Sequence, residues 1–412
     1  MTENKSIKDR VLLILSTFLP HFAVSMAMGA VGPLAPFLQS TLDISRAQLG
    51  ALTSVHSVGW IVMALAAGSI VERTGIRSWI FWCPAITCLL TLLFTGISSY
   101  VQWVAIFLLL GFAFSFINPA TVKAIILGFP TVGRGTALAI KQTGTPAGVF
   151  LAAVTLPAIA VSFGWKWSMA FVALINLAAG ILGWALYRDS RPGRPVKPDG
   201  EKTPGSYKKD IGELLHNRDF LLVSLLQGFF NIGQFVIQSY LVLYMVESLG
   251  YPTIYAGLVM ALTQFSGVAG RIAWGLMSDF VFAGKRVPTL KVAGLTTAAG
   301  LLGLALIDAS TPAWIIWIAA SIAGAGSIGF AGTAILLRAE LTGKNLAATS
   351  TGMGMAIGAW GVLMGPPVFG LIVDTTGSYK MAWALISALS LGATFLLGLV
   401  RERKPQGRAD EA

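Results

Sequence analysis

The stretch GSIVERTGIR at residues 68–77 comes directly after an apolar run, and GLMSDFVFAGKR at residues 275–286 follows another apolar run in the same way. Each stretch has a glycine, an acid four residues later (Glu72 and Asp279), and then a glycine and a base. The copies lie in opposite halves of the chain. The sequence therefore predicts two related halves, the kind of internal repeat from which two helical bundles of a membrane protein are built.

The composition is that of a protein that crosses a membrane many times. Of the 412 residues, 55% are hydrophobic and only 11% are charged, and the mean hydropathy is +0.74. A soluble domain carries roughly 25% charged residues. An apolar window of about 20 residues crosses ~30 Å of hydrocarbon. Twelve such spans are expected, at residues 11–38, 47–70, 78–97, 101–127, 136–161, 167–187, 220–246, 256–278, 288–307, 313–337, 347–372 and 382–400. The first is expected to stay as a helix, because it is long for a removable signal peptide and lacks a small-residue cleavage site.

The basic residues predict the orientation of these spans. With the N-terminus in the cytoplasm, the 29 Lys and Arg residues divide into 23 on the cytoplasmic side, three outside and three within spans. Those outside are Arg46, Lys166 and Lys380, and those within spans are Lys123, Lys141 and Arg271. The positive-inside rule then predicts a multi-pass protein of the cell inner membrane with both termini in the cytoplasm. This placement excludes a nucleic-acid role for the net charge of +11. We expect a monomer in the lipid bilayer.

A polar segment is expected to divide the chain. Residues 189–218 are rich in Pro, Gly and alternating charge, and are predicted to be a cytoplasmic linker. The expected domains are an N-terminal six-helix bundle at 1–188, the linker at 189–218, and a C-terminal six-helix bundle at 219–412. Cys83 and Cys88 both fall in the third span, so neither a disulfide framework nor a metal site is expected. No cofactor is expected.

With twelve spans and a central linker, the chain resembles the transporters of the major facilitator superfamily. Their signature loop between helices 2 and 3, glycine-x-x-x-acid-base-x-glycine-x-base, is matched by Gly68, Glu72, Arg73, Gly75 and Arg77. The stretch with Asp279 is a looser copy. The resemblance implies an all-α membrane fold of two pseudo-symmetric six-helix bundles that transport by alternating access. We expect these residues to form a gating loop, in which the small residue lets helices approach and the acid and base pair. The sequence gives no sign of an enzyme.

Three cations are expected inside the membrane without a carboxylate. All 18 acidic residues fall in loops, tails or span ends. A charge at the centre of a span costs roughly 2.5–3.5 kcal/mol on insertion scales, and water, backbone carbonyls or a bound anion must offset that cost. At 1.5 Å per residue, Arg271 is about 12 Å deep, Lys141 about 10 Å and Lys123 about 7 Å. Lys123 can therefore snorkel to the interface, whereas Arg271 and Lys141 are the stronger candidates for contact with an anion.

Polar side chains form stripes near these cations. Gln227, Asn231, Gln234 and Gln238 recur at steps of four, three and four, which places them on one helix face. Amides that face lipid would be unsatisfied, so this stripe is predicted to look inward. Hydrogen bonds between helices are the alternative role. The candidate substrate-binding residues are Arg271, Lys141, Lys123, Gln264, Asn231, Gln234, Gln227, Asn118, Gln142, Tyr240 and Trp360.

A second resemblance suggests the substrate class. In the oxalate/formate exchangers and the related monocarboxylate transporters, a helix 8 arginine before a W-G-x-x-S-D stretch pairs with a substrate carboxylate. The matching residues are Arg271, Trp274, Gly275, Ser278 and Asp279. The exchangers add a lysine in helix 11 that is missing here, and the monocarboxylate transporters have an aspartate where Gly267 stands. Helix 5 is the pseudo-symmetric partner of helix 11, so Lys141 is expected to supply the second cation. The resemblance implies a mono- or dicarboxylate substrate.

The coupling of transport stays open at the level of sequence. His21 and His56 are the span residues that titrate near neutral pH, and they are the coupling candidates for proton symport. Neutral, hydrogen-bonded imidazoles are the alternative, and anion exchange needs no titrating group. We therefore expect a secondary active transporter of a small organic anion, working by proton symport or anion exchange. Multidrug efflux, transport of an inorganic anion such as nitrate, and a membrane enzyme or receptor are the rival functions.

Overall fold

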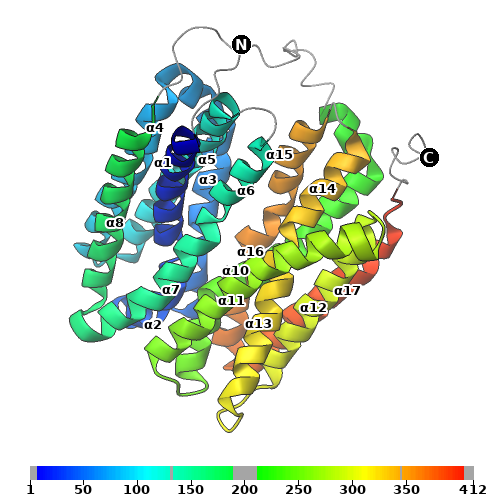
Figure 1. Cartoon of the computed structure of the whole chain (residues 1–412). Coiled ribbons are helices and arrows are strands. Elements are labelled where there is room, and N and C mark those ends of the chain that lie inside the picture. The colour runs from blue at the N-terminus through cyan, green and yellow to red at the C-terminus, as the bar shows by residue number, and fades with distance from the viewer. Residues whose placement is uncertain (1–6, 130–132, 189–210, 344–345, 403–412) are drawn as a thin grey trace, which may run out of the picture. The chain divides into compact units, whose positions relative to one another are not determined.

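A computed structural model describes residues 7–129, 133–188, 211–343 and 346–402, and within these the secondary structure is helical throughout (Figure 1). The first half contains α1 (Ile7–Met28), α2 (Val31–Leu42), α3 (Arg46–Thr74), α4 (Ile76–Thr95), α5 (Tyr100–Gly128), α6 (Arg134–Gln142), α7 (Gly144–Phe163) and α8 (Trp165–Leu186). The second half contains α10 (Arg218–Glu247), α11 (Thr253–Leu276), the π-helical turn η1 (Met277–Val281), α12 (Arg286–Leu306), α13 (Ala313–Gly329), α14 (Ala331–Thr342), α15 (Ala347–Gly358), α16 (Trp360–Thr376), α17 (Tyr379–Leu396) and the 3-10 turn η2 (Leu397–Leu399).

The number of membrane spans agrees with the sequence. Among the described residues, eleven helical segments are long and apolar enough to cross a bilayer. The two parts of α3, which is bent, form the twelfth when they count as one span. The all-α fold class predicted from hydropathy is thereby confirmed. The predicted linker at 189–218 lies outside the described residues as far as residue 210.

Four spans are broken in the middle. Each break lies beside a glycine, namely Gly29, Gly144, Gly329 or Gly358, in the spans α1/α2, α6/α7, α13/α14 and α15/α16. Glycine in a helix interior costs about 1 kcal/mol relative to alanine, so these are places where the helix is easily interrupted. The fifth and eleventh spans, which are pseudo-symmetric partners, are thus interrupted in the same manner.

The helices gather into two compact units. Unit 1 holds the described residues up to 188 together with Gln238–Gln264, and unit 2 holds the remainder of the second half. The joined ends of α10 and α11 therefore pack with the first six spans. The Tyr240 hydroxyl donates to the Arg46 carbonyl at 2.6 Å, and Arg46 forms an ion pair with Glu247 at 2.8 Å. The compact units and the predicted domains are thus different divisions of the chain.

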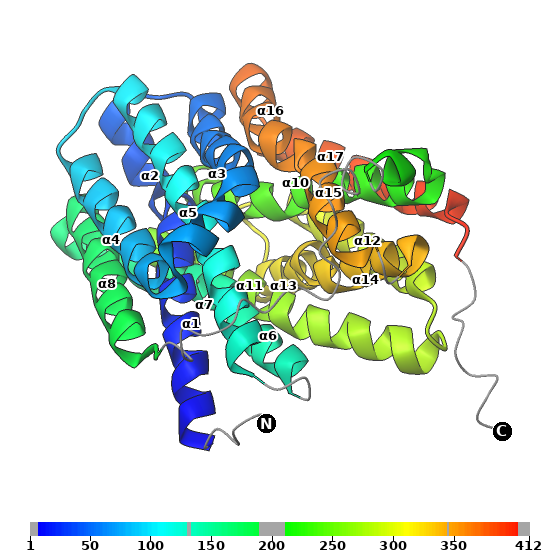
Figure 2. The ribbon, with the colours of Figure 1, turned by 90° about the horizontal axis from the view of Figure 1, so that it is seen from above.

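Within unit 1, α1 lies among α4, α5, α7 and α8 (Figures 1 and 2). The contact between α1 and α7 is especially close, because a Cβ atom at Gly148 would overlap the Phe22 carbonyl. Only glycine allows the two backbones to meet there. In unit 2, α12 packs against α13 and α17. The α1–α7 contact brings polar side chains of two spans together in the interior of unit 1.

Candidate substrate site

Lys141 is a fully buried cation held by amides. It lies at the end of α6, two residues before the break in its span, and its side chain is 0% exposed. The Nζ atom donates to Asn118 Oδ1 at 2.5 Å and to Gln142 Oε1 at 2.9 Å. No carboxylate of the described residues pairs with it. Two neutral acceptors satisfy donors of the ammonium but leave its charge uncompensated.

His21 lies close to this lysine. Its Nε2 atom is 2.9 Å from Thr145 Oγ1, and Ser25 donates to the same hydroxyl at 3.4 Å. The positive charge of Lys141 acts on the ring. Within the described part of the chain, the other ring nitrogen, Nδ1, is buried without a hydrogen-bond partner. The imidazole therefore has one nitrogen available to a ligand or a proton.

His56 packs against the same aromatic ring as His21. The centroids of His56 and Phe114 are 5.6 Å apart, and those of His21 and Phe114 are 6.4 Å apart, both edge to face. Both imidazoles are buried, with His56 7% exposed. Unit 1 therefore brings Lys141, Asn118, Gln142 and His21 together, and His56 packs against the same Phe114 ring as His21.

Arg271 belongs to unit 2, where it contacts the neighbouring helix α13. Its Nε donates to the Ile328 carbonyl at 3.2 Å, and one turn on, Trp274 donates to the Ala325 carbonyl at 2.9 Å. The Arg271 side chain is partly exposed, and Ile272 beside it is 61% exposed. One of its five N–H donors is thus used between helices, and the others remain for a ligand or water.

The α10 amides have separate partners. Asn231 donates to the Gly358 carbonyl at 2.9 Å, at the break between α15 and α16. Gln227 accepts from the Arg338 guanidinium, and Gln234 is half-buried. Gln238 is buried in unit 1. At least two members of the predicted stripe therefore hold helices of unit 2 together, as the helix-packing alternative proposed.

Three further candidates, Gln264, Trp360 and Tyr240, each make a polar contact. Gln264 is 1% exposed and makes a long 3.5 Å contact with Thr263. Trp360 donates to the Leu225 carbonyl at 3.1 Å and packs edge to face on Phe229. Tyr240, already described, is bonded to the backbone at the start of α3. The two aromatic side chains thus have hydrogen-bond partners within their own units.

The gating loop of the first half differs from the expectation in two ways. Glu72 pairs with Lys123 at 3.8 Å, so the prediction that all three interior cations lack a carboxylate is wrong for Lys123. Arg77 donates to the Trp184 carbonyl at 3.3 Å and lies over its ring, while Arg73 is exposed. A Cβ atom at Gly68 would meet nothing within 4 Å, so close helix approach does not explain this glycine here. Gly75 has φ +93°, a conformation that favours glycine.

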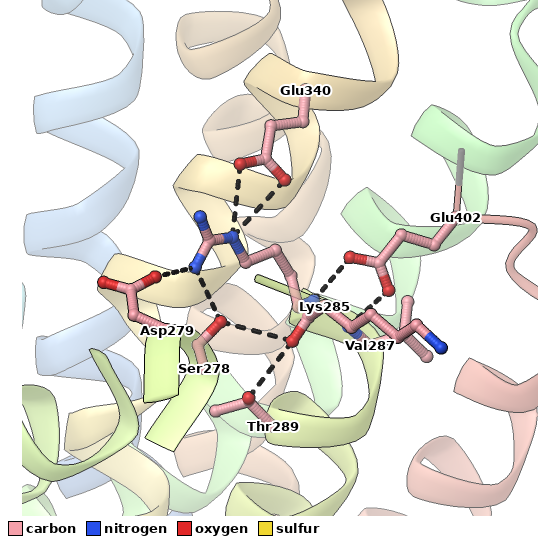
Figure 3. A network of polar contacts seen from close by, with 8 residues as sticks. Ser278, Asp279, Lys285, Val287, Thr289, Glu340 and Glu402 are labelled. Carbon is pink, nitrogen blue, oxygen red and sulfur yellow. Dashed lines mark hydrogen bonds and ion pairs between the residues drawn. The ribbon is translucent and has the colours of Figure 1, made fainter. Parts of the chain in front are cut away.

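The loop of the second half has the more extensive network. Asp279, Ser278 and Glu340 all bind the Arg286 guanidinium, at 2.5, 2.7 and 3.2 Å. Figure 3 shows these three side chains converging from η1 and α14 on the start of α12. Glu402 lies on the other side and accepts from the backbone N–H groups of Arg286 and Val287. The looser sequence copy therefore forms the denser set of ion pairs.

Arg338 is the buried cation that the sequence did not single out. It is 0% exposed in α14. The tenth span was expected to end at residue 337, which placed Arg338 among the cytoplasmic bases, but α14 continues to Thr342. Its guanidinium donates to the side-chain oxygen of Gln227 in α10. Hydropathy did not indicate that the helix continues past residue 337 and that Arg338 is buried within it.

Comparison with known proteins gives a consistent set of relatives. Residues 17–366 match the model of the Major Facilitator Superfamily. The hexuronate transporter of Bacillus subtilis (strain 168) is 24% identical over 409 residues, which cover 97% of this chain and 96% of that protein. The probable galactarate/D-glucarate transporter GarP of Escherichia coli (strain K12) is 24% identical over 460 residues, 98% of each chain.

One further relative has a different named substrate, and one solved structure has a similar fold. The probable sulfoacetate transporter SauU of Cupriavidus necator is 23% identical over 98% of each chain. The inward-facing, unoccupied crystal structure of a bacterial homologue of the human lysosomal transporter Spinster superposes with a TM-score of 0.78, at 16% identity, over 96% of each chain. At that identity the likeness concerns the fold alone.

Proposed function

Because the chain belongs to the major facilitator superfamily, we propose that it is a secondary active transporter of a small organic anion, a mono- or dicarboxylate, that works by alternating access. The observation that carries the proposal is Lys141, which is fully buried and bound by amide oxygens without a carboxylate among the described residues. An anionic ligand would compensate its charge.

The named substrates of the relatives support an acid with several polar groups. Hexuronate, galactarate, D-glucarate and sulfoacetate, in the names of these relatives, are all small organic anions. Around Lys141 lie the Asn118 and Gln142 amides and the Thr145 hydroxyl, which donate to or accept from hydroxyl groups. We infer a sugar-acid type of substrate, with Lys141 binding its carboxylate as a point charge.

Arg271 is proposed as a substrate contact within unit 2. It keeps free donors after its bond to the Ile328 carbonyl, and a guanidinium binds carboxylates in a bidentate manner. Gln234 in unit 2 and Gln264 in unit 1 are proposed as polar contacts of the substrate, each within its own unit. The gating loops are proposed to act in the change between access states rather than in binding.

For coupling, we propose proton symport through His21. Its ring is bonded to Thr145 and senses the charge of Lys141, so an anion bound at Lys141 would favour the protonated ring. His56 faces Phe114 instead. Anion exchange is the competing mechanism. The protein is further proposed to be a monomer of the cell inner membrane with both termini in the cytoplasm, as the distribution of basic residues suggests.

Purified protein in proteoliposomes tests the proposed function. Counterflow of labelled D-glucuronate, D-glucarate and sulfoacetate is expected, in contrast to no flux of D-glucose or of a quaternary ammonium cation. Nitrate in the same panel separates organic from inorganic anions. Transport of the cation, or flux of none of these compounds, would contradict the proposal.

A further inference from the structure

Unit 2 contains a second buried cation whose surroundings resemble those of Lys141. Arg338 in α14 is 0% exposed, although an arginine keeps its charge in a protein. Its Nη1 donates to the amide oxygen of Gln227 from α10. The nearest acid along the helix, Glu340, binds Arg286 instead. Among the described residues no carboxylate forms an ion pair with Arg338.

The donors that remain free on Arg338 are those that suit a carboxylate. Its Nε and Nη2 atoms are buried and have no hydrogen-bond partner in the described part of the structure. The N–H bonds of Nε and Nη2 point in parallel along one edge of the planar guanidinium, and this edge binds the two oxygens of a carboxylate at once. Gln227 occupies the opposite nitrogen and so fixes the plane of the group. The side chain is therefore oriented for a bidentate anion that is not supplied by the protein.

A glycine-rich helix covers this edge. A Cβ atom at Gly354 in α15 would lie 2.5 Å from Arg338 Cδ, 2.6 Å from its Nε and 3.0 Å from Ser224 Oγ. Only a glycine thus allows α15 to lie against the guanidinium. The same helix ends at the break beside Gly358, where its last carbonyl is held by Asn231. Movement of α15 about this break would expose the free edge together with the Ser224 hydroxyl.

We propose that Arg338 forms a carboxylate-binding site of unit 2, with Gln227 orienting the guanidinium and Gly354 of α15 as its cover. The inference rests on the proposed transport of organic acids. The ligand class is the carboxylate of the transported acid, bound bidentately. Arg338 and Lys141 would then each bind an acid group within their own unit.

Ligand binding by purified variants tests this site. D-Glucarate binding in detergent is expected to weaken about 10- to 100-fold in Arg338→Lys, because the lysine keeps the charge but loses the two parallel charge-assisted bonds. Gly354→Ala is expected to weaken it similarly, because the methyl group displaces the guanidinium. The matched control is Gly352→Ala on the same helix, where a Cβ meets nothing within 4 Å; its affinity is expected to equal that of the wild type. Lys380→Gln controls for loss of an exposed cation.

The outcomes separate this site from the proposed function. Wild-type affinity in Arg338→Lys and in Gly354→Ala, with acid uptake intact, would overturn the Arg338 site and leave the transport proposal standing. Absence of acid binding and uptake in the wild type would instead remove the proposed function. If Arg338 only joins α14 to α10, then Arg338→Lys lowers the melting temperature without changing the dissociation constant. If Arg338→Lys fails to fold, the Gly354→Ala and Gly352→Ala pair decides alone.

Discussion

The interior of the protein and the loop ends of its helices treat positive charge differently. Lys141 and Arg338 are fully buried and are bound by amide oxygens. Arg286 and Lys123 lie nearer the helix ends and are bound by carboxylates, at 2.5 and 3.8 Å. A cation that only holds helices together is expected to pair with a carboxylate, because a buried charge without a counter-ion strongly destabilises the folded protein. The interior therefore retains charge that a transported anion would balance, and four predictions probe this difference.

Removal of the Lys141 charge should have the largest effect. Lys141→Gln is expected to reduce uptake of D-glucuronate more than 100-fold, while the melting temperature stays equal or rises because a buried uncompensated charge is removed. Both are measured on purified protein, by proteoliposome uptake and thermal unfolding. Lys166→Gln, which removes an exposed lysine, is the control and should behave as the wild type. A stability loss with intact uptake would make Lys141 a structural residue.

Substitution of Arg271 should have the second-largest effect on uptake. Arg271→Gln is expected to abolish most uptake, and Arg271→Lys should retain a part of it, because the charge remains while the bond to the Ile328 carbonyl is lost. The apparent KM for D-glucuronate measures the change. An unchanged KM, together with an equal drop in melting temperature for both variants, would show that Arg271 serves only the contact between α11 and α13.

The two histidines should differ in their effect on pH dependence. Uptake driven by proton symport is expected to rise as the outside pH falls from 8 towards 5.5, the range in which imidazole titrates. His21→Asn should flatten this profile, whereas His56→Asn should preserve it, since His21 is bonded to Thr145 and lies within reach of the charge of Lys141, while both rings pack on Phe114. Identical profiles in all three proteins would favour anion exchange.

The smallest effects are expected at the helix ends. Arg286→Gln breaks contacts with Asp279, Ser278 and Glu340. Because the two carboxylates are exposed to solvent, this should cost about 1 kcal/mol. Lys123→Gln breaks one exposed pair and should cost less than about 0.5 kcal/mol. Thermal unfolding ranks the two, and uptake in Lys123→Gln should match the wild type. A reversed order would contradict the stated difference between the two loops.

The spans and the fold class could be predicted because hydropathy over about 20 residues depends on composition rather than on tertiary contacts. The helical rise predicted that Lys141 lies away from the end of its span, and the side chain is fully buried. Gln142 is its neighbour in the chain, but Asn118 could only be placed by the packing of α5 against α6.

Other parts of the site depend on packing that no periodicity encodes. The tenth span continues past its apolar window, so Arg338 looked like a loop residue until α14 placed it against Gln227. The α10 stripe was rightly predicted to be one face of a helix, but which amides hold helices and which stay free depends on breaks such as the one at Gly358. Glu72 reaches Lys123 because α3 and α5 pack together, although the two residues are far apart in the sequence.

The carboxylate of Glu402 has a practical consequence for handling this protein. It closes the first turn of α12 by accepting two backbone N–H groups, and the neighbouring Arg401 N–H donates to Asp219 at the start of α10 at 3.3 Å. Residues 401 and 402, which follow η2, thus bind the starts of α10 and α12. Affinity tags and fluorescent reporters are best fused after residue 402, because a junction placed before Glu402 would leave the N–H groups of Arg286 and Val287 without their acceptor.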